Sequence, residues 1–330
     1  MSDTVAVIVN PRSRANRRDP RIAAEFQALI GDRGRVLAPK SLAELDTMAA
    51  DLHRAQPAVI GVHGGDGTLH KTVTALGKVF GAEPLPPIAI LCGGTMNVVA
   101  TSLHIRERPR TFLAAITEGL RSGRPLDTLR RRCLRIDDTL GFLFGNGLPA
   151  NFLGEYYGDH SGAYGPGRAA WLLTRAFFSA LWRGPFARRL FRRFKGSVHV
   201  DGQALEQGAF VGLMAGTVRE VGMGFKLVHR ADDDPERFGV LAIHAPPLAL
   251  ALDLWAVHRG RGIAAQRAFS AVASRMDVRP TDGSMSYTID GDLYRTQAPL
   301  SISLGPQIAF VKPPSALIVR GGGDTMVATR

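Results

Sequence analysis

The sequence predicts an α/β protein, in which an N-terminal parallel sheet covered by helices is followed by an antiparallel β-rich region with helical insertions. Strand-like and helix-like segments alternate through the first third of the chain, as in repeated βα units. After about Leu126, short strand-like segments follow one another with turn residues between them. A length of 330 residues suits two domains. We expect these to be residues 1–127 and 128–305, with a tail from about 306 to 330 packing back on the first.

The alternation in the first third can be followed segment by segment. Ser41, with Glu44 three residues later, is typical of the start of a helix. Ligands of such sheets bind at the carboxyl ends of the strands. The expected strands are 4–11, 35–38, 58–64 and 88–93, and the expected helices are 21–31, 41–55 and 68–80, with another starting after Gly94.

The remainder of the chain has the pattern of an antiparallel domain. Helical insertions are expected at 166–195 and 246–262. The expected strands are 126–136, 140–147, 196–202, 209–216, 238–244, 284–294 and 299–305.

Charge and composition narrow the class of protein. A formal net charge of +12 and an isoelectric point near 10.4 indicate partners that carry phosphate. No secretory leader precedes the first strand, and the apolar runs near 171–182 and 248–257 are shorter than the roughly 20 residues of a membrane span. We therefore expect a cytoplasmic protein. Cys92 and Cys133 have no CxxC spacing and are expected to be buried free thiols.

Three glycines surround Asp66 in the segment 64–67, between a strand and a helix expected to begin at Thr68. Glycines let backbone N–H groups approach an anion, and a helix N-terminus attracts negative charge. Because Asp66 would repel a bare phosphate, a nucleotide bound to Mg²⁺ fits better. The P-loop and the dinucleotide fingerprint both fail here because His70 occupies a required position. The alternative is a tight turn with Asp66 as the helix N-cap.

Two more loops follow strands of the same predicted sheet. Gly93 and Gly94 lead into Thr95 and Asn97 at the start of a helix. The segment 10–14, NPRSR, ends the first strand and supplies polar and positively charged side chains, although Asn-Pro alone is also typical of a simple turn. Loops on neighbouring strands would direct backbone donors toward one place.

The segments VNPRSR, GGDGTLHKTVTAL and GGTMNVVA, in this order and spacing, resemble the diacylglycerol kinase/sphingosine kinase catalytic family, including its bacterial lipid kinases. A fourth element, IDGDLY, stands where that family has Asp-Gly-Glu, so the resemblance covers most of the chain. The pentapeptide GGDGT by itself is shared with NAD kinases.

The resemblance implies a nucleotide-binding α/β domain and a β-rich lipid-binding domain, with the active site in the cleft between them. It implies ATP and Mg²⁺ as cofactors, with Asp66 helping to hold the metal, directly or through water, and a lipid alcohol as the acceptor. The residues expected to bind the nucleotide are Asn10, Pro11, Arg12, Ser13, Arg14, Gly64, Gly65, Asp66, Gly67, Thr68, Leu69, His70, Gly94, Thr95 and Asn97.

The late acidic pair Asp290 and Asp292 is expected to supply the proton acceptor that phosphoryl transfer to an alcohol needs. In an extended chain both carboxylates would lie on one face. By the resemblance, Asp292 stands where the family has a longer Glu as the base, and His70 where an Asn is usual. We assign the base jointly to both acids and prefer Asp292. The alternative for Asp290 and Gly291 is a type I′ hairpin turn, which could also present an acid.

The insertion from Arg168 to Lys195 contains no acidic residue. Phe186, Leu190 and Phe194 repeat every four residues and would line one face of a helix, which suits an anionic membrane surface. The alternative is that they belong to the core. No nucleic-acid-binding signature is found, so no nucleic acid partner is expected.

The favoured function is ATP- and Mg²⁺-dependent phosphorylation of a lipid hydroxyl, such as that of diacylglycerol or a sphingoid base, at the inner face of the membrane in phospholipid metabolism. Two alternatives stay open, a soluble NAD kinase and a non-catalytic homologue that binds lipid or nucleotide. A homodimer is also left open. The acidic run from Asp232 to Asp234 is expected to be a solvated loop.

Overall fold

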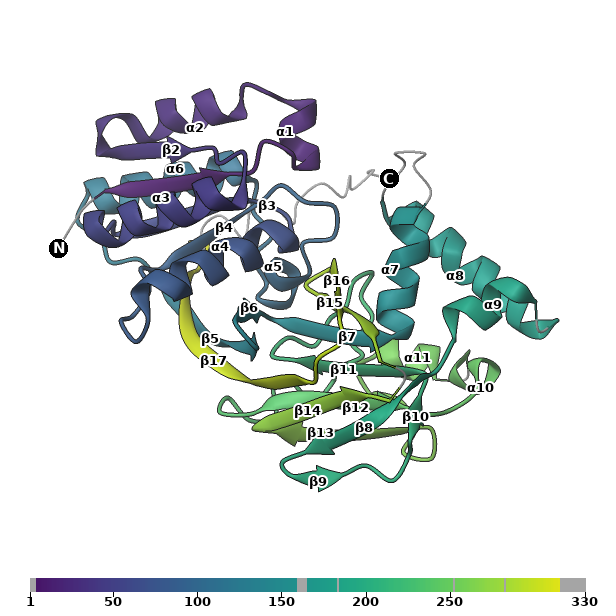
Figure 1. Ribbon diagram of the computed structural model, residues 1–330. Coiled ribbons are helices and arrows are strands. Elements are labelled where there is room, and N and C mark those ends of the chain that lie inside the picture. The colour runs from purple at the N-terminus through teal and green to yellow at the C-terminus, as the bar shows by residue number, and fades with distance from the viewer. Residues whose placement is uncertain (1–3, 159–164, 183, 252, 282, 315–330) are drawn as a thin grey trace, which may run out of the picture. The chain divides into compact units, whose positions relative to one another are not determined.

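The computed structural model describes residues 4–158, 165–182, 184–251, 253–281 and 283–314 (Figure 1). The chain divides into two compact units. The first comprises Met1–Gly94, Leu103–Arg130 and Ile308–Arg330, and the second comprises Thr95–Ser102 and Arg131–Gln307.

The first unit is built on a parallel sheet with the strand order β2, β1, β3, β4. These strands are β1 (Val5–Val9), β2 (Gly34–Leu37), β3 (Val59–Gly64) and β4 (Ile88–Cys92). Every residue of β1 and β3 is buried, as expected for central strands with helices on both faces.

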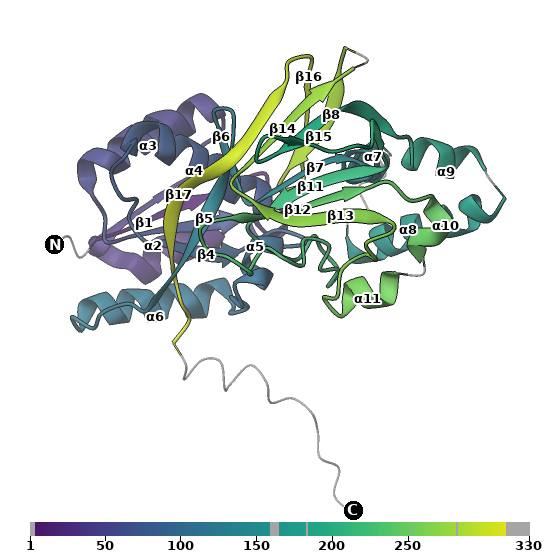
Figure 2. The ribbon, with the colours of Figure 1, turned by 90° about the horizontal axis from the view of Figure 1, so that it is seen from below.

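Helices cover both faces of this sheet. Figure 2 shows α3 (Leu42–Ala55) and α4 (Asp66–Phe80) on one side and α2 (Ile22–Ile30) and α6 (Pro109–Arg121) on the other, and each pair packs together. The hydroxyl of Ser41 accepts a hydrogen bond from the backbone N–H of Glu44, so α3 begins with the expected cap. The sequence analysis did not predict α6 or the short helix α1 (Arg14–Arg18); a 3-10 turn, η1 (Gly31–Arg33), follows α2.

The second unit contains two mainly antiparallel sheets. One has the order β13, β12, β11, β7, β15, β16, and the other places β10, β8, β14 and part of β17 side by side, with β9 on β8. The strands of the first are β7 (Leu143–Gly147), β11 (Gly212–Gly216), β12 (Phe238–Ile243), β13 (Ala268–Ala273), β15 (Met285–Ile289) and β16 (Asp292–Thr296). Those of the second are β8 (Phe194–Val200), β9 (Gln203–Ala204), β10 (Ala209–Phe210), β14 (Arg275–Pro280) and β17 (Leu300–Val311).

A hydrophobic core draws its residues from both of these sheets. Phe144 comes from the six-stranded sheet and Phe210 and Met276 from the other, and all three are fully buried in one cluster. In β8, every second residue from Phe194 to Val200 is buried, because one face of the strand points into this core. The predicted fold class, a parallel α/β region followed by an antiparallel β-rich region with helices, is confirmed.

Two strands run through the boundary between the units. Strand β5 (Thr128–Ile136) contains Arg130 and Arg131, where the division falls, and its end pairs with β6 (Thr139–Gly141). In β17, Leu300 to Ser303 pair with β14 in the second unit, whereas Phe310 pairs in parallel with Ile88 of the first unit. Residues 315–330 of the expected tail lie outside the described residues.

The helices of the second unit are α5 (Val98–Ser102), α7 (Leu148–Gly158), α8 (Pro166–Leu181), α9 (Pro185–Leu190), α10 (Pro247–Ala251) and α11 (Leu254–His258). The prediction of one helical face through Phe186, Leu190 and Phe194 is wrong. Helix α9 ends at Leu190, and Phe194 begins strand β8. All three side chains are buried, because they pack in the core of the second unit.

Candidate active site

Three loops at the carboxyl ends of β1, β3 and β4 are joined by hydrogen bonds. The backbone N–H of Asn10 donates to the carbonyl of His63 over 3.0 Å, and the N–H of Gly93 donates to the carbonyl of Gly64 over 2.8 Å. The side-chain amide of Asn10 donates to the hydroxyl of Thr68 over 2.8 Å. The loops predicted to act together therefore lie together in the first unit.

The two glycine loops approach each other at Gly65 and Gly94, and Gly64 packs closely on Thr68, so an added Cβ would be crowded at either place. A Cβ on Gly65 would lie 3.1 Å from the Cα of Gly94, and a Cβ on Gly64 would lie 2.3 Å from the hydroxyl oxygen of Thr68. Backbone without side chains is what the close approach of a phosphate requires. Gly65 and Gly94 thus adjoin at one place, as the sequence predicts for loops that share a ligand.

Helix α4 begins at Asp66, two residues earlier than the predicted start at Thr68. Gly65 is its N-cap, so the alternative in which Asp66 caps the helix is wrong. Asp66 lies in the first turn, where the helix dipole stabilises a carboxylate. Burial, together with the negative charge of Asp66, raises the pKa of the Cys92 thiol to about 11. Both described cysteines are free, and burial also raises the pKa of Cys133 to about 12, so both thiols stay protonated and unreactive at neutral pH.

The predicted nucleotide-binding residues differ in exposure. Leu69 and His70 belong to the buried side of α4, with exposed fractions of 2% and 1%. Their side chains therefore offer no surface to a ligand. Gly65, Asp66, Gly67 and Thr68 are half-buried, as is Arg14, whereas Pro11 and Arg12 are exposed.

Other predicted residues act within the fold itself. Ser13 is the N-cap of α1, and its hydroxyl accepts from the backbone N–H of Asn16. Thr95 and Asn97 follow Gly94 directly in the chain but group with the second unit, where Asn97 adopts a left-handed backbone with φ of 48° just before α5.

The donor set near the glycine loops fits a hydrated magnesium ion. No group of three or more His, Cys, Asp or Glu side chains suited to a metal occurs among the described residues. Mg²⁺ commonly keeps several waters and binds one or two carboxylates together with substrate phosphates. Asp66, half-buried beside the glycine loops, supplies one such carboxylate.

Asp290 and Asp292 lie at a hairpin between β15 and β16. Asp290 and Gly291 form the turn, with φ values of 47° and 87°, and Ile289 pairs with Asp292 across it. The two positive values agree with the type I′ turn that Asp-Gly favours. The expectation that both carboxylates lie on one face of an extended strand is wrong, because Asp290 belongs to the turn and Asp292 is the first residue of β16.

The carboxylate of Asp290 holds the backbone of a neighbouring strand. It is 7% exposed and accepts hydrogen bonds from the N–H groups of Phe142, at 3.0 Å, and Leu143, at 2.9 Å. The backbone N–H of Asp290 donates in return to the carbonyl of Leu143. Because its oxygens are engaged by backbone donors, Asp290 is suited to positioning the hairpin, and Asp292 is the better candidate for the base.

Two further residues near the predicted site did not emerge from the sequence. Burial, together with the negative charge of Asp292, raises the pKa of Tyr294 to about 12. The ring stacks on Tyr287, with 5.4 Å between the ring centroids. His63 is fully buried, and its Nδ1 lies 2.9 Å from the carbonyl oxygen of Leu91. Burial lowers the pKa of His63, so it stays neutral at pH 7. The sequence offered one signal for Tyr294, which is that it stands two residues after Asp292 on the same expected strand.

The acidic run from Asp232 to Asp234 is engaged with arginines. Asp232 lies 2.7 Å from Arg131, and Asp233 lies 2.7 Å from Arg230. Asp234 instead accepts a hydrogen bond from the backbone N–H of Glu236 at 2.9 Å.

One family model matches part of this chain, and several solved structures are similar to nearly all of it. Residues 4–129 match the model of the diacylglycerol kinase catalytic domain. A diacylglycerol kinase from Bacillus anthracis str. Sterne has 15% sequence identity and a TM-score of 0.63, and the alignment covers 96% of this chain and 98% of that one. Two candidate diacylglycerol kinases from the same organism have 17% identity each. Their TM-scores are 0.70 and 0.66, with 95% and 94% of this chain and 98% and 97% of theirs covered.

Among curated proteins the sequence has no match. The TM-scores show that the three structures share the fold of this chain. Because their sequence identities to it are only 15% to 17%, they show the fold alone. The resemblance to the diacylglycerol kinase catalytic family was predicted from VNPRSR, the two glycine loops and IDGDLY. It is confirmed over residues 4–129, which contain the first three of these segments.

Proposed function

We propose that this chain, whose residues 4–129 match the diacylglycerol kinase catalytic domain, is an ATP-dependent kinase that phosphorylates a hydroxyl group of a lipid. The close approach of Gly65 to Gly94 is the observation that carries the proposal. It gives two loops without side chains beside the N-terminus of α4, an arrangement that suits the phosphates of a nucleotide.

In this proposal the residues of the first unit hold the nucleotide. Backbone N–H groups near Gly65 and Gly94 bind phosphate oxygens, and Thr68 is held in place by the amide of Asn10. Arg12 and Arg14 contribute positive charge from the loop after β1. A bound Mg²⁺, held by Asp66 directly or through water, would neutralise charge on the transferred phosphoryl group.

Asp292 is proposed to accept the proton of the attacking hydroxyl, with Asp290 holding the hairpin that carries it. Such a group typically contributes a factor of about 10² to 10⁴ to the rate. Tyr294, which stays protonated because of its raised pKa, is available as a hydrogen-bond donor close to Asp292.

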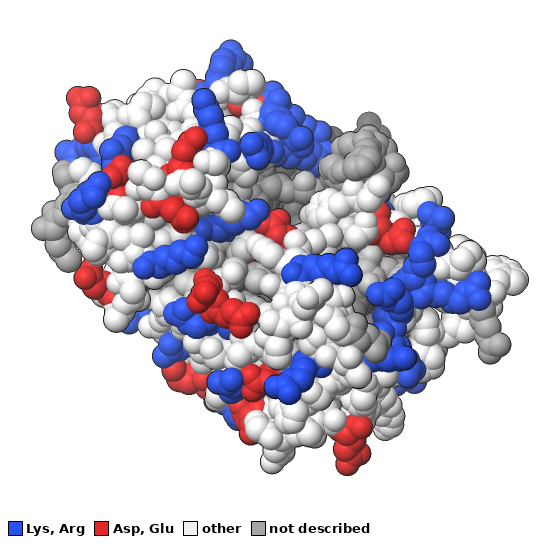
Figure 3. All heavy atoms as spheres, viewed as in Figure 1, with Lys and Arg blue, Asp and Glu red and all other residues white. Residues whose placement is uncertain are grey.

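Contact with a membrane surface is the other part of the proposal. The surface that suits it is the outer face of α8, defined by Trp171, Phe177, Phe178, Leu181 and Trp182, all of which are exposed. Trp182 is 76% exposed. Arginine side chains gather near this helix, in the region of α8 and α9 at the right of Figure 3. No helix within the described ranges has the length and apolarity that crossing a bilayer would require.

The test is to incubate the protein with MgATP and a cellular lipid extract and to identify new lipid phosphates by mass spectrometry. We expect one class of lipid alcohol to gain a phosphate, and Asp292→Asn to lower the rate at least 100-fold. An incubation with NAD in place of lipid tests the NAD kinase alternative. If a broad lipid panel gives no product while the protein still binds nucleotide, the kinase proposal is wrong and the non-catalytic alternative is favoured.

A further inference from the structure

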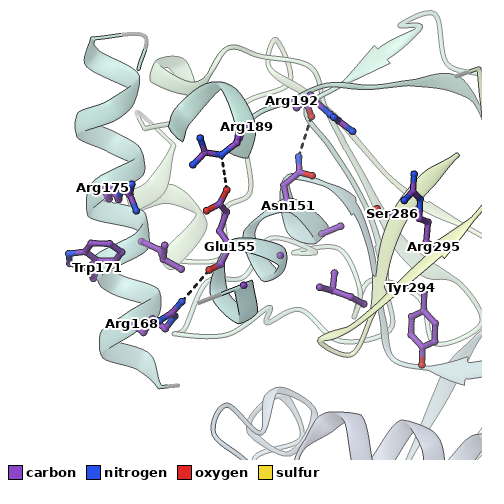
Figure 4. A pocket seen from close by; sticks show the side chains of 15 residues that line it. Asn151, Glu155, Arg168, Trp171, Arg175, Arg189, Arg192, Ser286, Tyr294 and Arg295 are labelled. Carbon is purple, nitrogen blue, oxygen red and sulfur yellow. Dashed lines mark hydrogen bonds and ion pairs between the residues drawn. The ribbon is translucent and has the colours of Figure 1, made fainter. Parts of the chain in front are cut away.

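A pocket of about 850 Å³ is lined by residues of the second unit. Its walls come from α7, from α8, from α9 with the residues just after it, and from the hairpin of β15 and β16 (Figure 4). Five arginines line it: Arg168, Arg175, Arg189, Arg192 and Arg295.

The charge of this arginine pocket is strongly positive. Glu155 is the single acidic residue among the described residues that line it. Its carboxylate accepts from Nε of Arg189 at 3.0 Å, and its backbone carbonyl accepts from Nη2 of Arg168 at 3.3 Å. Arg175 and Arg192 form no ion pair within the described part of the chain. The pocket therefore attracts an anion, and planar guanidinium groups suit the oxygens of a phosphate.

Contacts within the protein order part of the pocket before any ligand binds, namely the side chain of Arg175 and the backbone at Leu190 and Arg192. The guanidinium of Arg175 lies over the ring of Phe186, 4.3 Å from its centroid, and 5.3 Å from that of Trp171. The side-chain amide of Asn151 donates to the backbone carbonyls of Leu190, at 3.1 Å, and Arg192, at 3.4 Å. A site whose side chains are already ordered loses less entropy on binding.

An apolar surface adjoins the cationic one. Trp171, Leu172 and Leu293 also line the pocket. At about 100° per residue, the helical repeat places Trp171, Phe178 and Trp182 on the side of α8 next to that of Arg168 and Arg175. These three residues are exposed. A free phosphate would use only the arginines, whereas a lipid that carries a phosphate would use both surfaces.

We infer that the arginine pocket binds the phosphate of an anionic phospholipid head group, with the acyl chains directed to the outer face of α8. The inference deepens the membrane-contact part of the proposed function and rests on it for the outer face of α8, but it requires no phosphoryl transfer.

The first test measures binding to the full-length protein by titration calorimetry at fixed salt and without nucleotide. The probe is dihexanoyl phosphatidylmethanol, an anionic phosphodiester with no free hydroxyl, so it cannot be a phosphate acceptor. We expect it to bind at least tenfold more tightly than inorganic phosphate. Absence of binding overturns the inference, and equal affinity for inorganic phosphate would show a free-phosphate site instead.

The second test separates a specific site from diffuse attraction. Arg192 and Arg295 are exposed and line the pocket, so the double variant Arg192→Gln/Arg295→Gln should weaken probe binding at least tenfold. The matched control is Arg188→Gln/Arg193→Gln, which removes the same charge from exposed positions outside the pocket. The control should stay within about twofold of the unmodified protein.

Equal losses in the two double variants would mean that net charge alone attracts the lipid, and the inference would be wrong. Circular dichroism of each variant checks that the second unit is folded. A single Arg192→Gln variant, compared with Arg193→Gln, answers the same question if a double variant fails to fold. An inactive kinase would leave these results unchanged, so failure of the proposed function is distinguishable.

Discussion

The side-chain amide of Asn10 donates a hydrogen bond to the hydroxyl of Thr68, 2.8 Å away, and so ties the end of β1 to the first turn of α4. The carbonyl oxygen of the same amide accepts from the backbone N–H of Arg12 at 2.9 Å. One side chain therefore fixes both the first loop and the glycine loop.

Replacing Asn10 with Ala should weaken nucleotide binding about fivefold, because a hydrogen bond of this kind contributes about 1 kcal/mol. Fluorescence titration with a labelled ATP analogue measures this. Thr68→Val should cost a similar amount, and the double variant should cost less than the sum of the two. Thr47→Val, at an exposed helical position on α3, is the control and should leave affinity unchanged. Strict additivity of the two single effects would contradict the coupling.

Gly93→Ala should lower the free energy of unfolding by about 1 to 3 kcal/mol, because a Cβ there would lie 2.7 Å from the buried ring of His63. Urea denaturation of the purified variant gives the value. Gly167→Ala is the control, since nothing lies within 4 Å of a Cβ at that exposed position on α8. We expect the control to be neutral or slightly stabilising. Equal stability of the two variants would mean that the loop adapts without cost.

Asp290→Asn should lower stability, whereas Asp292→Asn should lower activity. Asn keeps the shape of Asp290 and tolerates its positive φ, but it loses the charge-assisted hydrogen bonds to Phe142 and Leu143, worth about 1.5 to 3 kcal/mol. Thermal denaturation and a lipid phosphorylation assay separate the two effects. A fully stable but inactive Asp290→Asn protein would return the role of base to Asp290.

Stability should fall as the pH drops below about 6.5. Burial lowers the pKa of His63 below its usual value of 6.5, and that of His229 as well, so the unfolded chain binds more protons than the folded one in this range. The two histidines therefore contribute to the free energy of unfolding above pH 6.5. This contribution is lost as the pH falls toward their lower pKa values in the folded protein. In His63→Leu the urea midpoint should depend less steeply on pH than in the unmodified protein. The remaining dependence is expected to come from His229. An unchanged slope would contradict the role of His63.

Phe178→Ser/Trp182→Ser should weaken sedimentation with anionic vesicles, because it removes apolar area from the exposed face of α8. The free energy of unfolding should stay within about 0.5 kcal/mol of the unmodified value. Phe186→Ser should behave differently, since a buried Phe packs there and its loss costs about 3 to 5 kcal/mol. If Phe178→Ser/Trp182→Ser binds vesicles as tightly as the unmodified protein, the outer face of α8 is not the docking surface.

Much of the first unit could be predicted because its central strands are rich in Val and Ile and its loops contain paired glycines. The approach of Gly65 to Gly94 follows from that pattern, since neighbouring parallel strands end at the same edge of the sheet. Helix α6 was missed, although its hydrophobic residues have helical spacing and Pro109 opens it.

The second unit was harder to predict because long-range contacts decide its local structure. Phe186 and Phe194 fit the same four-residue spacing, yet Phe186 lies in α9 and Phe194 begins β8, and each packs in a different core cluster. The engagement of Asp290 with Phe142 spans 148 residues, so the spacing of the acids could not reveal it. The arginine pocket likewise joins α8 to Arg295, far apart in the sequence.

Strand β17 makes completion of the first unit depend on residues that are synthesised only after most of the second unit. Ile308, Phe310 and Val311 are buried, and Phe310 pairs with Ile88 of β4. While the ribosome is still translating the intervening residues, the outer edge of β4 has no strand to pair with and its backbone groups are open to other chains. The glycine-loop unit therefore cannot be completed until Ile308 to Val311 have been synthesised, and a premature stop codon before residue 308 removes part of that unit.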